Sequence, residues 1–272
     1  MHLKELSENI TKVIATESQG FKAETAFVLG PGLSTLADDL QNKKVIPYSV
    51  LPGFGSCTVQ GHDGNFVIGL LNGTPVLFLQ GRPHWYEDKS ALDFHAFILA
   101  IKAFGCRNIL MTNAAGAIDN DIPVGAIVGI TDHINLQFRN PLIGLGIDGD
   151  RFLGLEQAYD EDFRAKLQQA AAAIGVEFYK GVYISTLGPS FETPAEIKAY
   201  RILGGQVVGM STVPEVIAAR YHGLKVAVLS VISNKAAGMG DEPLSHKLTL
   251  ERAKSASDNL KNIIKTYIEK CQ

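Results

Sequence analysis

The feature that most constrains the fold of this chain is an alternation of strand-like apolar runs with helix-like segments, which starts near residue 25. Such alternation is typical of α/β proteins, in which helices cover both faces of a largely parallel sheet. The predicted strands are 25–29, 57–60, 65–70, 75–79, 107–112, 126–131, 178–184, 206–208 and 224–232. The predicted helices are 3–18, 34–40, 90–103, 161–174, 194–203, 212–221 and 246–269.

The number of strands, and the hairpin-like stretch 57–79, predict a mixed central sheet that partly closes. The expected fold class is therefore a three-layer α/β/α arrangement around such a sheet. No Ser/Gly linker, charge block or internal repeat interrupts the sequence. We therefore expect a single domain over residues 1–272.

Composition excludes several classes of protein. The 272 residues are 46% hydrophobic and 19% charged, with a net charge of −3, so no basic surplus is available to hold nucleic acid. The three cysteines have no metal-ligand spacing and indicate reduced thiols. Residues 1–18 resemble an amphipathic helix and not a signal peptide, and no apolar run approaches the ~20 residues that span a bilayer. These features predict a cytoplasmic protein.

Two segments of the sequence each predict the start of a helix. In the first, Thr193 precedes Pro194 and Glu196, the pattern of a capping box, so Phe191 and Glu192 fall in the loop before a helix. In the second, the strand at 206–208 leads to a helix capped by Ser211 or Thr212.

A helix N-terminus can bind an anion. An acid and an aromatic near such a site suggest a ligand with a flat polar ring and a phosphate. The alternative is that both segments are ordinary capped helices.

Other polar groups follow the predicted buried strands. Gly30, Pro31 and Gly32 follow the first strand, and a cluster from Arg82 to Glu87 follows the strand at 75–79. Arginine offers a planar set of donors for phosphate, and histidine can protonate a phosphate oxygen near neutral pH. Ligands in open α/β sheets gather at strand ends, which favours a binding role over a surface ion pair.

Small residues at 112–116 leave room for a ligand, and a Gly-rich loop at 236–243 is a candidate lid. The long excursion 134–159 carries Phe138 and Phe152 and predicts a functional loop or a partner contact. His95, His133 and His222 are interpreted as structural.

Taken together, these motifs resemble the trimeric purine nucleoside phosphorylases. The matching segments are Gly-Arg-Pro-His-Trp-Tyr-Glu (81–87), Thr-Asn-Ala-Ala-Gly (112–116), Asp-His-Ile-Asn (132–135), Gly-Pro-Ser-Phe-Glu-Thr (188–193), Val-Gly-Met-Ser-Thr-Val-Pro-Glu (208–215) and Ser-Asn-Lys (233–235). The resemblance implies phosphorolysis of inosine and guanosine, or their deoxy forms, to free purine and pentose 1-phosphate in purine salvage. It also implies a homotrimer, with inorganic phosphate as co-substrate and no metal or other cofactor.

The resemblance also implies a set of site residues. Phosphate would contact Gly30, Ser34, His62, Arg82, His84, Ala114 and Ser211. The pentose would contact Tyr86, Met210 and His246, with Phe152 contributed by a neighbouring subunit and Tyr183 near the sugar. The base would contact Ala115, Gly116, Phe191, Glu192 and Asn234. His84, Glu192 and Asn234 would carry the catalysis.

One position departs from the family pattern. The usual Gly-Ser-Gly phosphate turn is Gly30-Pro31-Gly32 here, and proline has neither a hydroxyl nor an N–H. Either Ser34 substitutes or phosphate binds with one ligand fewer, which predicts a weaker phosphate site.

Alternative functions lie within and outside the family. A xanthosine-accepting phosphorylase would need the site to adapt to a 2-oxo group beside Glu192. A methylthioadenosine phosphorylase would have an acid in place of Asn234 and an apolar 5′ pocket in place of His246. A non-catalytic nucleotide-binding protein could keep the fold. A nucleoside hydrolase usually needs an aspartate-lined metal site, which the sequence does not suggest.

Overall fold

The structure of the chain is a computed structural model that describes residues 3–52, 54, 64–145, 152–240 and 246–270. Its strands are β1 (Thr25–Leu29), β2 (Gln41–Pro47), β3 (Asn65–Leu71), β4 (Thr74–Gln80), β5 (Asn108–Ala117), β6 (Ile127–Asn135), β7 (Phe178–Ser185), β8 (Val207–Gly209) and β9 (Lys225–Lys235). Its α-helices are α1 (Leu3–Glu17), α2 (Ala91–Ala103), α3 (Glu161–Ala173), α4 (Pro194–Ile202), α5 (Val213–Tyr221) and α6 (His246–Lys270). Three short 3₁₀ helices, η1 (Ser34–Asp39), η2 (Tyr48–Val50) and η3 (Trp85–Glu87), complete the described elements.

The strands form one mixed sheet in the order β2-β3-β4-β1-β5-β8-β7-β6-β9. An additional parallel pairing between β5 and β9 closes the last five strands of that order into a barrel. The pairings β1–β4, β1–β5, β6–β7 and β7–β8 are parallel, whereas β2–β3, β3–β4, β5–β8 and β6–β9 are antiparallel. The predicted mixed and partly closed sheet is therefore confirmed.

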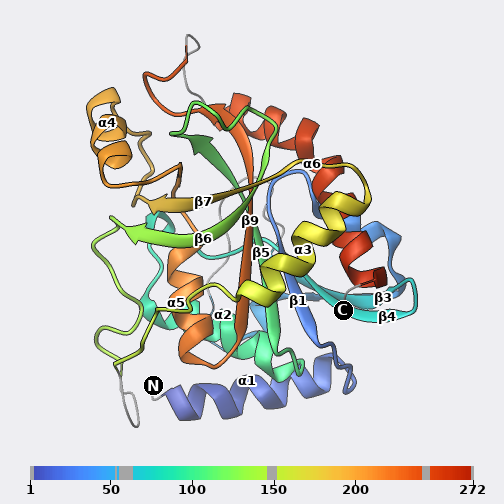
Figure 1. The fold of residues 1–272 in the computed structure, drawn as a ribbon. Coiled ribbons are helices and arrows are strands. Elements are labelled where there is room, and N and C mark those ends of the chain that lie inside the picture. Colours follow the sequence, from blue (N-terminus) through green and yellow to red (C-terminus); the bar gives the residue numbers. More distant parts are fainter. Residues whose placement is uncertain (1–2, 53, 55–63, 146–151, 241–245, 271–272) are drawn as a thin grey trace.

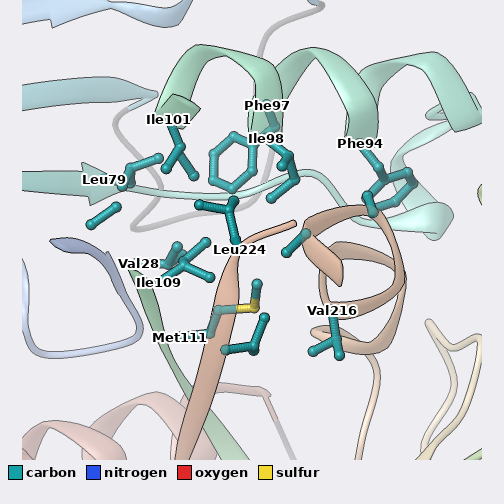
Figure 2. Packing of buried hydrophobic residues seen from close by; sticks show 14 of the residues in the cluster. Val28, Leu79, Phe94, Phe97, Ile98, Ile101, Ile109, Met111, Val216 and Leu224 are labelled. Atoms are coloured by element: carbon teal, nitrogen blue, oxygen red, sulfur yellow. The ribbon is translucent and has the colours of Figure 1, made fainter. Parts of the chain in front are cut away.

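Helices cover the sheet on two sides (Figure 1). One hydrophobic cluster lies between the sheet and α1, α2 and α5, and a second lies between the sheet and α3 and α6. Figure 2 shows the first cluster, in which Phe97 and Ile98 of α2 approach Ile109 and Met111 of β5. Each such buried side chain stabilises the fold by roughly 1.5–3 kcal/mol relative to exposure. None of the described helices is long and apolar enough to cross a bilayer.

The structure corrects the predicted strands in two respects and leaves one of them untested. β2 is absent from the prediction because its sequence is mostly polar and exposed, as an edge strand allows. The predicted strand at 57–60 lies outside the described residues. β5 and β9 continue to Ala117 and Lys235, so the segments 112–116 and 233–235 lie within strands instead of following them.

The pairing of β5 with β9 contains an irregularity beside these segments. Ala115 pairs with Ile232 and Gly116 pairs with Asn234, which leaves Ser233 as an extra residue in β9. A bulge of this kind redirects side chains and commonly lies next to a functional site. It sets Asn234 directly beside Gly116, where a Cβ would lie 3.1 Å from Asn234 Nδ2.

Candidate active site

A cavity of about 690 Å³ opens along β5 and β9, between the loop after β7 and the start of α5. Its lining includes thirteen of the predicted site residues, namely Gly30, Ser34, Arg82, His84, Tyr86, Ala114, Ala115, Gly116, Phe191, Glu192, Met210, Ser211 and Asn234. These residues come from segments that are far apart in the sequence. The convergence that the motifs predict is therefore present in the structure.

Arg82 follows β4 and is almost wholly buried, with 2% of its surface exposed. Its Nη1 lies 3.2 Å from Thr212 Oγ1 and 3.4 Å from Glu215 Oε1, and its Nη2 donates to the carbonyl oxygen of Thr112. Burial raises the pKa of the Glu215 carboxyl, while the charge of Arg82 opposes that rise. The guanidinium is thus fixed at the cavity wall by groups from β5 and α5.

His84 and Tyr86 lie in the turn that follows Arg82. The His84 Nδ1 is 2.7 Å from Glu87 Oε2, and an ionised carboxylate can only accept, so Nδ1 carries a proton. That bond leaves Nε2 as the other polar atom of the ring. The ring of Tyr86 stacks on the His84 ring at 4.7 Å, and burial raises the pKa of the Tyr86 phenol above its ordinary range.

The predicted side-chain cap of α5 by Ser211 or Thr212 is wrong, although the helix does begin at this point. Thr212 occupies the N-cap position of α5, but its side chain makes no capping hydrogen bond. It has φ 76° and ψ −51°, and Val213 N donates to Ser211 O at 2.9 Å, which together describe a γ-turn. Positive φ in a β-branched residue is strained, at a cost of about 1–3 kcal/mol.

The strained turn directs the Thr212 hydroxyl toward the site instead of the helix. Thr212 Oγ1 accepts from Arg82 Nη1 and from Asn113 Nδ2, the latter at 2.8 Å. Because both of its lone pairs are then used, its own proton is donated to Ser211 Oγ at 3.0 Å. The Ser211 proton can therefore be donated to an acceptor in the cavity.

A second group of residues follows β7. Glu192 and Phe191 lie before α4, whose predicted capping box is confirmed by Thr193 and Glu196. Glu192 Oε1 accepts from the hydroxyl of Thr186 at 2.9 Å. Burial raises the pKa of the Glu192 carboxyl above its usual value.

Asn234 is held by its neighbours in the β9 bulge. Its Oδ1 accepts from Ser233 Oγ at 2.8 Å, and its Nδ2 donates to the Lys235 carbonyl at 2.9 Å. These bonds fix which end of the amide is oxygen and which is nitrogen. One further lone pair and one further N–H of Asn234 can serve a ligand.

The remaining predicted site residues are not seen in the cavity wall. His62 lies outside the described residues, and His246 begins α6 with its side chain outside the described part of the chain. Phe152 is 87% exposed and is not among the described lining residues. Tyr183 is buried behind the wall, where a Cβ on Gly209 would meet its hydroxyl oxygen at 2.3 Å.

Several residues at the site are missed by sequence reasoning. The pattern indicates Glu215 and Thr212 only as parts of a helix start, and it does not single out Thr186. Leu250 and Lys254 of α6 also line the cavity. A carboxylate in an otherwise apolar first turn, Val213 to Val216, is the signal that could have identified Glu215.

Three other histidines, at positions 95, 133 and 222, have structural partners, as predicted. His133 Nδ1 lies 2.9 Å from the Tyr159 hydroxyl, and His95 Nδ1 lies 2.8 Å from His222 Nε2. Burial lowers the pKa of His95 to about 4 and that of His222 to about 3, so both rings are neutral at physiological pH. Within the described residues, no three His, Cys, Asp or Glu side chains gather as a metal site.

Comparison with known proteins agrees with this geometry. A family model described as "Phosphorylase superfamily" matches residues 26–269. Purine nucleoside phosphorylase 1 of Geobacillus stearothermophilus is 40% identical over 247 residues, which cover 90% of this chain and 90% of that protein. Purine nucleoside phosphorylase of Mus musculus is 37% identical over 258 residues, covering 92% of this chain and 89% of the mouse protein.

A solved structure also matches along the whole chain. The purine nucleoside phosphorylase of Schistosoma mansoni in complex with inosine superposes with a TM-score of 0.92 at 32% identity, covering 100% of this chain and 99% of that one. The chain therefore belongs to the phosphorylase superfamily and, within it, to the purine nucleoside phosphorylases. It is an enzyme that cleaves purine nucleosides with phosphate.

We expect Glu215→Ala to lower the free energy of unfolding by about 3–5 kcal/mol, because the substitution takes the carboxylate away from a buried guanidinium. Denaturant unfolding of the wild type and variant measures this difference. The exposed pair of Lys43 and Asp38, 2.8 Å apart, supplies the control. Asp38→Ala is expected to cost less than about 1 kcal/mol. Equal losses in the two variants would contradict the assignment of Arg82 and Glu215 as a stabilising buried pair.

Proposed function

We propose that the substrates are the 6-oxopurine nucleosides inosine and guanosine, as ribosides or deoxyribosides. The products are hypoxanthine or guanine and a pentose 1-phosphate, in purine salvage. The observation that carries this proposal is that one cavity is lined both by the Arg82, His84 and Ser211 group and by Glu192 with Asn234. The first group suits an oxyanion, and the second suits a ring that carries an N–H and a carbonyl.

The phosphate end of the site supplies positive charge and donors. Arg82 contributes the guanidinium, Ser211 a hydroxyl proton, Ala114 its N–H, and the turn that follows Gly30 a further backbone donor. His84 donates a hydrogen bond from Nε2 when Nε2 carries a proton in addition to the one on Nδ1. His62 and Ser34 complete the proposed set. Holding phosphate against C1′ of the sugar supplies proximity without any metal.

A glycine is needed where the first turn meets β5. A Cβ at position 30 would lie 2.8 Å from the carbonyl oxygen of Thr112, too close for any side chain. The Gly30 N–H donates to Thr112 Oγ1 at 2.7 Å, which fixes the turn against β5. The glycine therefore allows the turn to lie against β5, where it lines the cavity.

In the reaction, an oxygen of hydrogen phosphate forms a bond to C1′ while the bond from C1′ to N9 of the purine breaks. The bonding electrons leave with the base, through an oxocarbenium-like transition state. The base takes up one proton, and in the net reaction this is the proton that hydrogen phosphate loses on becoming the phosphate ester. Asn234 hydrogen-bonds N7 and the 6-oxygen, and the Glu192 carboxylate accepts from N1–H. Groups aimed at charge that develops on the leaving base lower the barrier.

The pentose and the faces of the base are held by the remaining residues. Tyr86, the backbone of Met210 and His246 contact the 3′-, 2′- and 5′-hydroxyls, and Tyr183 supports the wall near the sugar. Phe191 packs on the base, while the small residues Ala115 and Gly116 leave room for it.

We also propose a cytoplasmic location and no cofactor beyond phosphate.

We expect phosphate-dependent release of hypoxanthine from inosine, with adenosine a poor substrate. Adenine presents a lone pair at N1 to the Glu192 carboxylate, and a mismatch of this type can cost about 10⁴-fold in kcat/KM. A steady-state assay over inosine, guanosine, xanthosine, adenosine and methylthioadenosine, with and without phosphate, measures this. Equal kcat/KM for adenosine and inosine would refute the proposed specificity. Preference for xanthosine or methylthioadenosine would favour the alternative functions.

The Glu192 carboxylate also sets the pH dependence of kcat/KM. Glu192 must be ionised to accept from N1–H, and burial raises its pKa. The value of kcat/KM for inosine should therefore fall as the pH decreases through a pKa above the ordinary glutamic acid value of about 4.3. The pH profile of the Glu192→Gln variant should lack that acid limb.

Pro31→Ser should lower the KM for phosphate, because serine restores a hydroxyl and an N–H at the turn that lines the cavity. Phosphate saturation at fixed inosine measures the change, and Pro31→Ala separates the N–H from the hydroxyl. The KM for inosine should stay within about twofold in both variants. An unchanged phosphate KM in the serine variant would show that position 31 has no part in binding phosphate.

We also propose a homotrimer in which Phe152 reaches a neighbouring subunit's sugar site. Its exposure supports this, because the ring is accessible to a neighbouring subunit and aromatic side chains are enriched in interfaces. Phe152→Ala should raise the KM for inosine about tenfold and leave the phosphate KM nearly unchanged. Phe138, which is 90% exposed, supplies a matched control. Sedimentation that finds a fully active monomer would contradict this proposal.

A further inference from the structure

We propose that Thr186 is a positioning residue that fixes the Glu192 carboxylate and so contributes to discrimination between 6-oxopurines and adenine. The inference rests on the proposed role of Glu192 in binding the base. It concerns a residue outside the motifs that carry the family resemblance. Three features support it: the way in which Thr186 is held, the acceptor of its single hydroxyl proton, and the ionisation of the carboxylate.

Thr186 directly follows β7, and its backbone is held from two sides. Its N–H donates to the carbonyl of Gly209 at 2.9 Å, and its own carbonyl accepts from the buried side chain of Gln137 at 3.2 Å. Only 8% of its surface is exposed. A residue held in this way presents its side chain in one place.

The hydroxyl of Thr186 has one proton and two nearby acceptors. Glu192 Oε1 lies at 2.9 Å, whereas the carbonyl oxygen of Gly209 lies at 3.5 Å and already accepts the Thr186 N–H. The shorter contact to an ionised group is the stronger one, so the proton goes to Glu192. Thr186 then uses one acceptor site of Oε1 and fixes the rotation of the carboxylate, whose other acceptor sites can accept from the base.

The backbone that follows Glu192 in the sequence is fixed as well. Thr193 and Glu196 form the capping box of α4, with Thr193 N donating to Glu196 Oε2 at 2.7 Å. Burial raises the pKa of Glu192 and the charge of Glu196 adds to that rise, while Tyr200 is a further titratable group on α4 that interacts with Glu192. Thr186 opposes this rise, since its hydrogen bond lowers the Glu192 pKa.

A consequence follows for specificity. The ionised carboxylate accepts from N1–H of a 6-oxopurine, whereas a protonated carboxyl can donate to N1 of adenine. Removing the Thr186 hydroxyl leaves the shape of the side chain but takes away a donor that favours the ionised form. More of the enzyme is then protonated at a given pH, and the carboxylate is also less well oriented.

Thr186→Val should lower kcat/KM for inosine about tenfold, the effect of losing one hydrogen bond to a charged group. The acid limb of its pH profile should move to higher pH, and the ratio of adenosine to inosine kcat/KM should rise. Thr186→Ser keeps the hydroxyl and should restore the profile. The KM for phosphate should stay within about twofold, which a general disturbance of the site would not allow.

A double-mutant cycle with Glu192→Gln completes the test. When Glu192→Gln is already present, removal of the Thr186 hydroxyl should change kcat/KM less than about twofold, because the carboxylate that it positions is gone. If the valine variant does not fold, Thr186→Ala removes the same hydroxyl with a smaller side chain. An unmoved acid limb together with unchanged inosine kinetics would overturn the inference. Failure of the wild type to cleave inosine would instead refute the proposed function.

Discussion

The structure depends on one buried cation. Arg82 leaves β4 and is held against β5 by the Thr112 carbonyl and against α5 by Thr212 and Glu215. Burying a guanidinium away from water is costly unless acceptors and an opposite charge surround it, and here these partners come from separate parts of the chain. Satisfying one side chain therefore aligns the turn after β4, the middle of β5 and the start of α5. The cavity lies where these elements meet.

The start of α5 shows the cost of this arrangement. A threonine at a helix N-cap would ordinarily accept from the helix backbone. Thr212 instead adopts a strained γ-turn and directs its hydroxyl to Arg82, Asn113 and Ser211. Strained conformations persist where surrounding contacts determine them, and they concentrate at functional sites. Here the strain orients the hydroxyl chain that ends at Ser211, facing the cavity.

The sequence allowed the α/β class, the helices and most strands to be predicted, because apolar periodicity and capping patterns such as Thr193 with Glu196 act locally. It did not allow β2 to be found, since an edge strand can be polar. The extension of β5 past Thr112 and the bulge at Ser233 depend on pairing between distant strands. The roles of Thr212 and Thr186 depend on hydrogen-bond partners that sequence spacing does not reveal.

The composition of β5 has a consequence for how substrate range could evolve. Its cavity-lining residues run from Thr112 to Gly116 and are small, and the strand pairs with β1, β8 and β9. A bulkier side chain there would reduce the volume available to a heterocycle. The strand cannot shift away, because it is hydrogen-bonded to its neighbours. A change in what this pocket admits is therefore easier to make in the adjoining loops, whose length and chemistry can vary while β5 keeps its position.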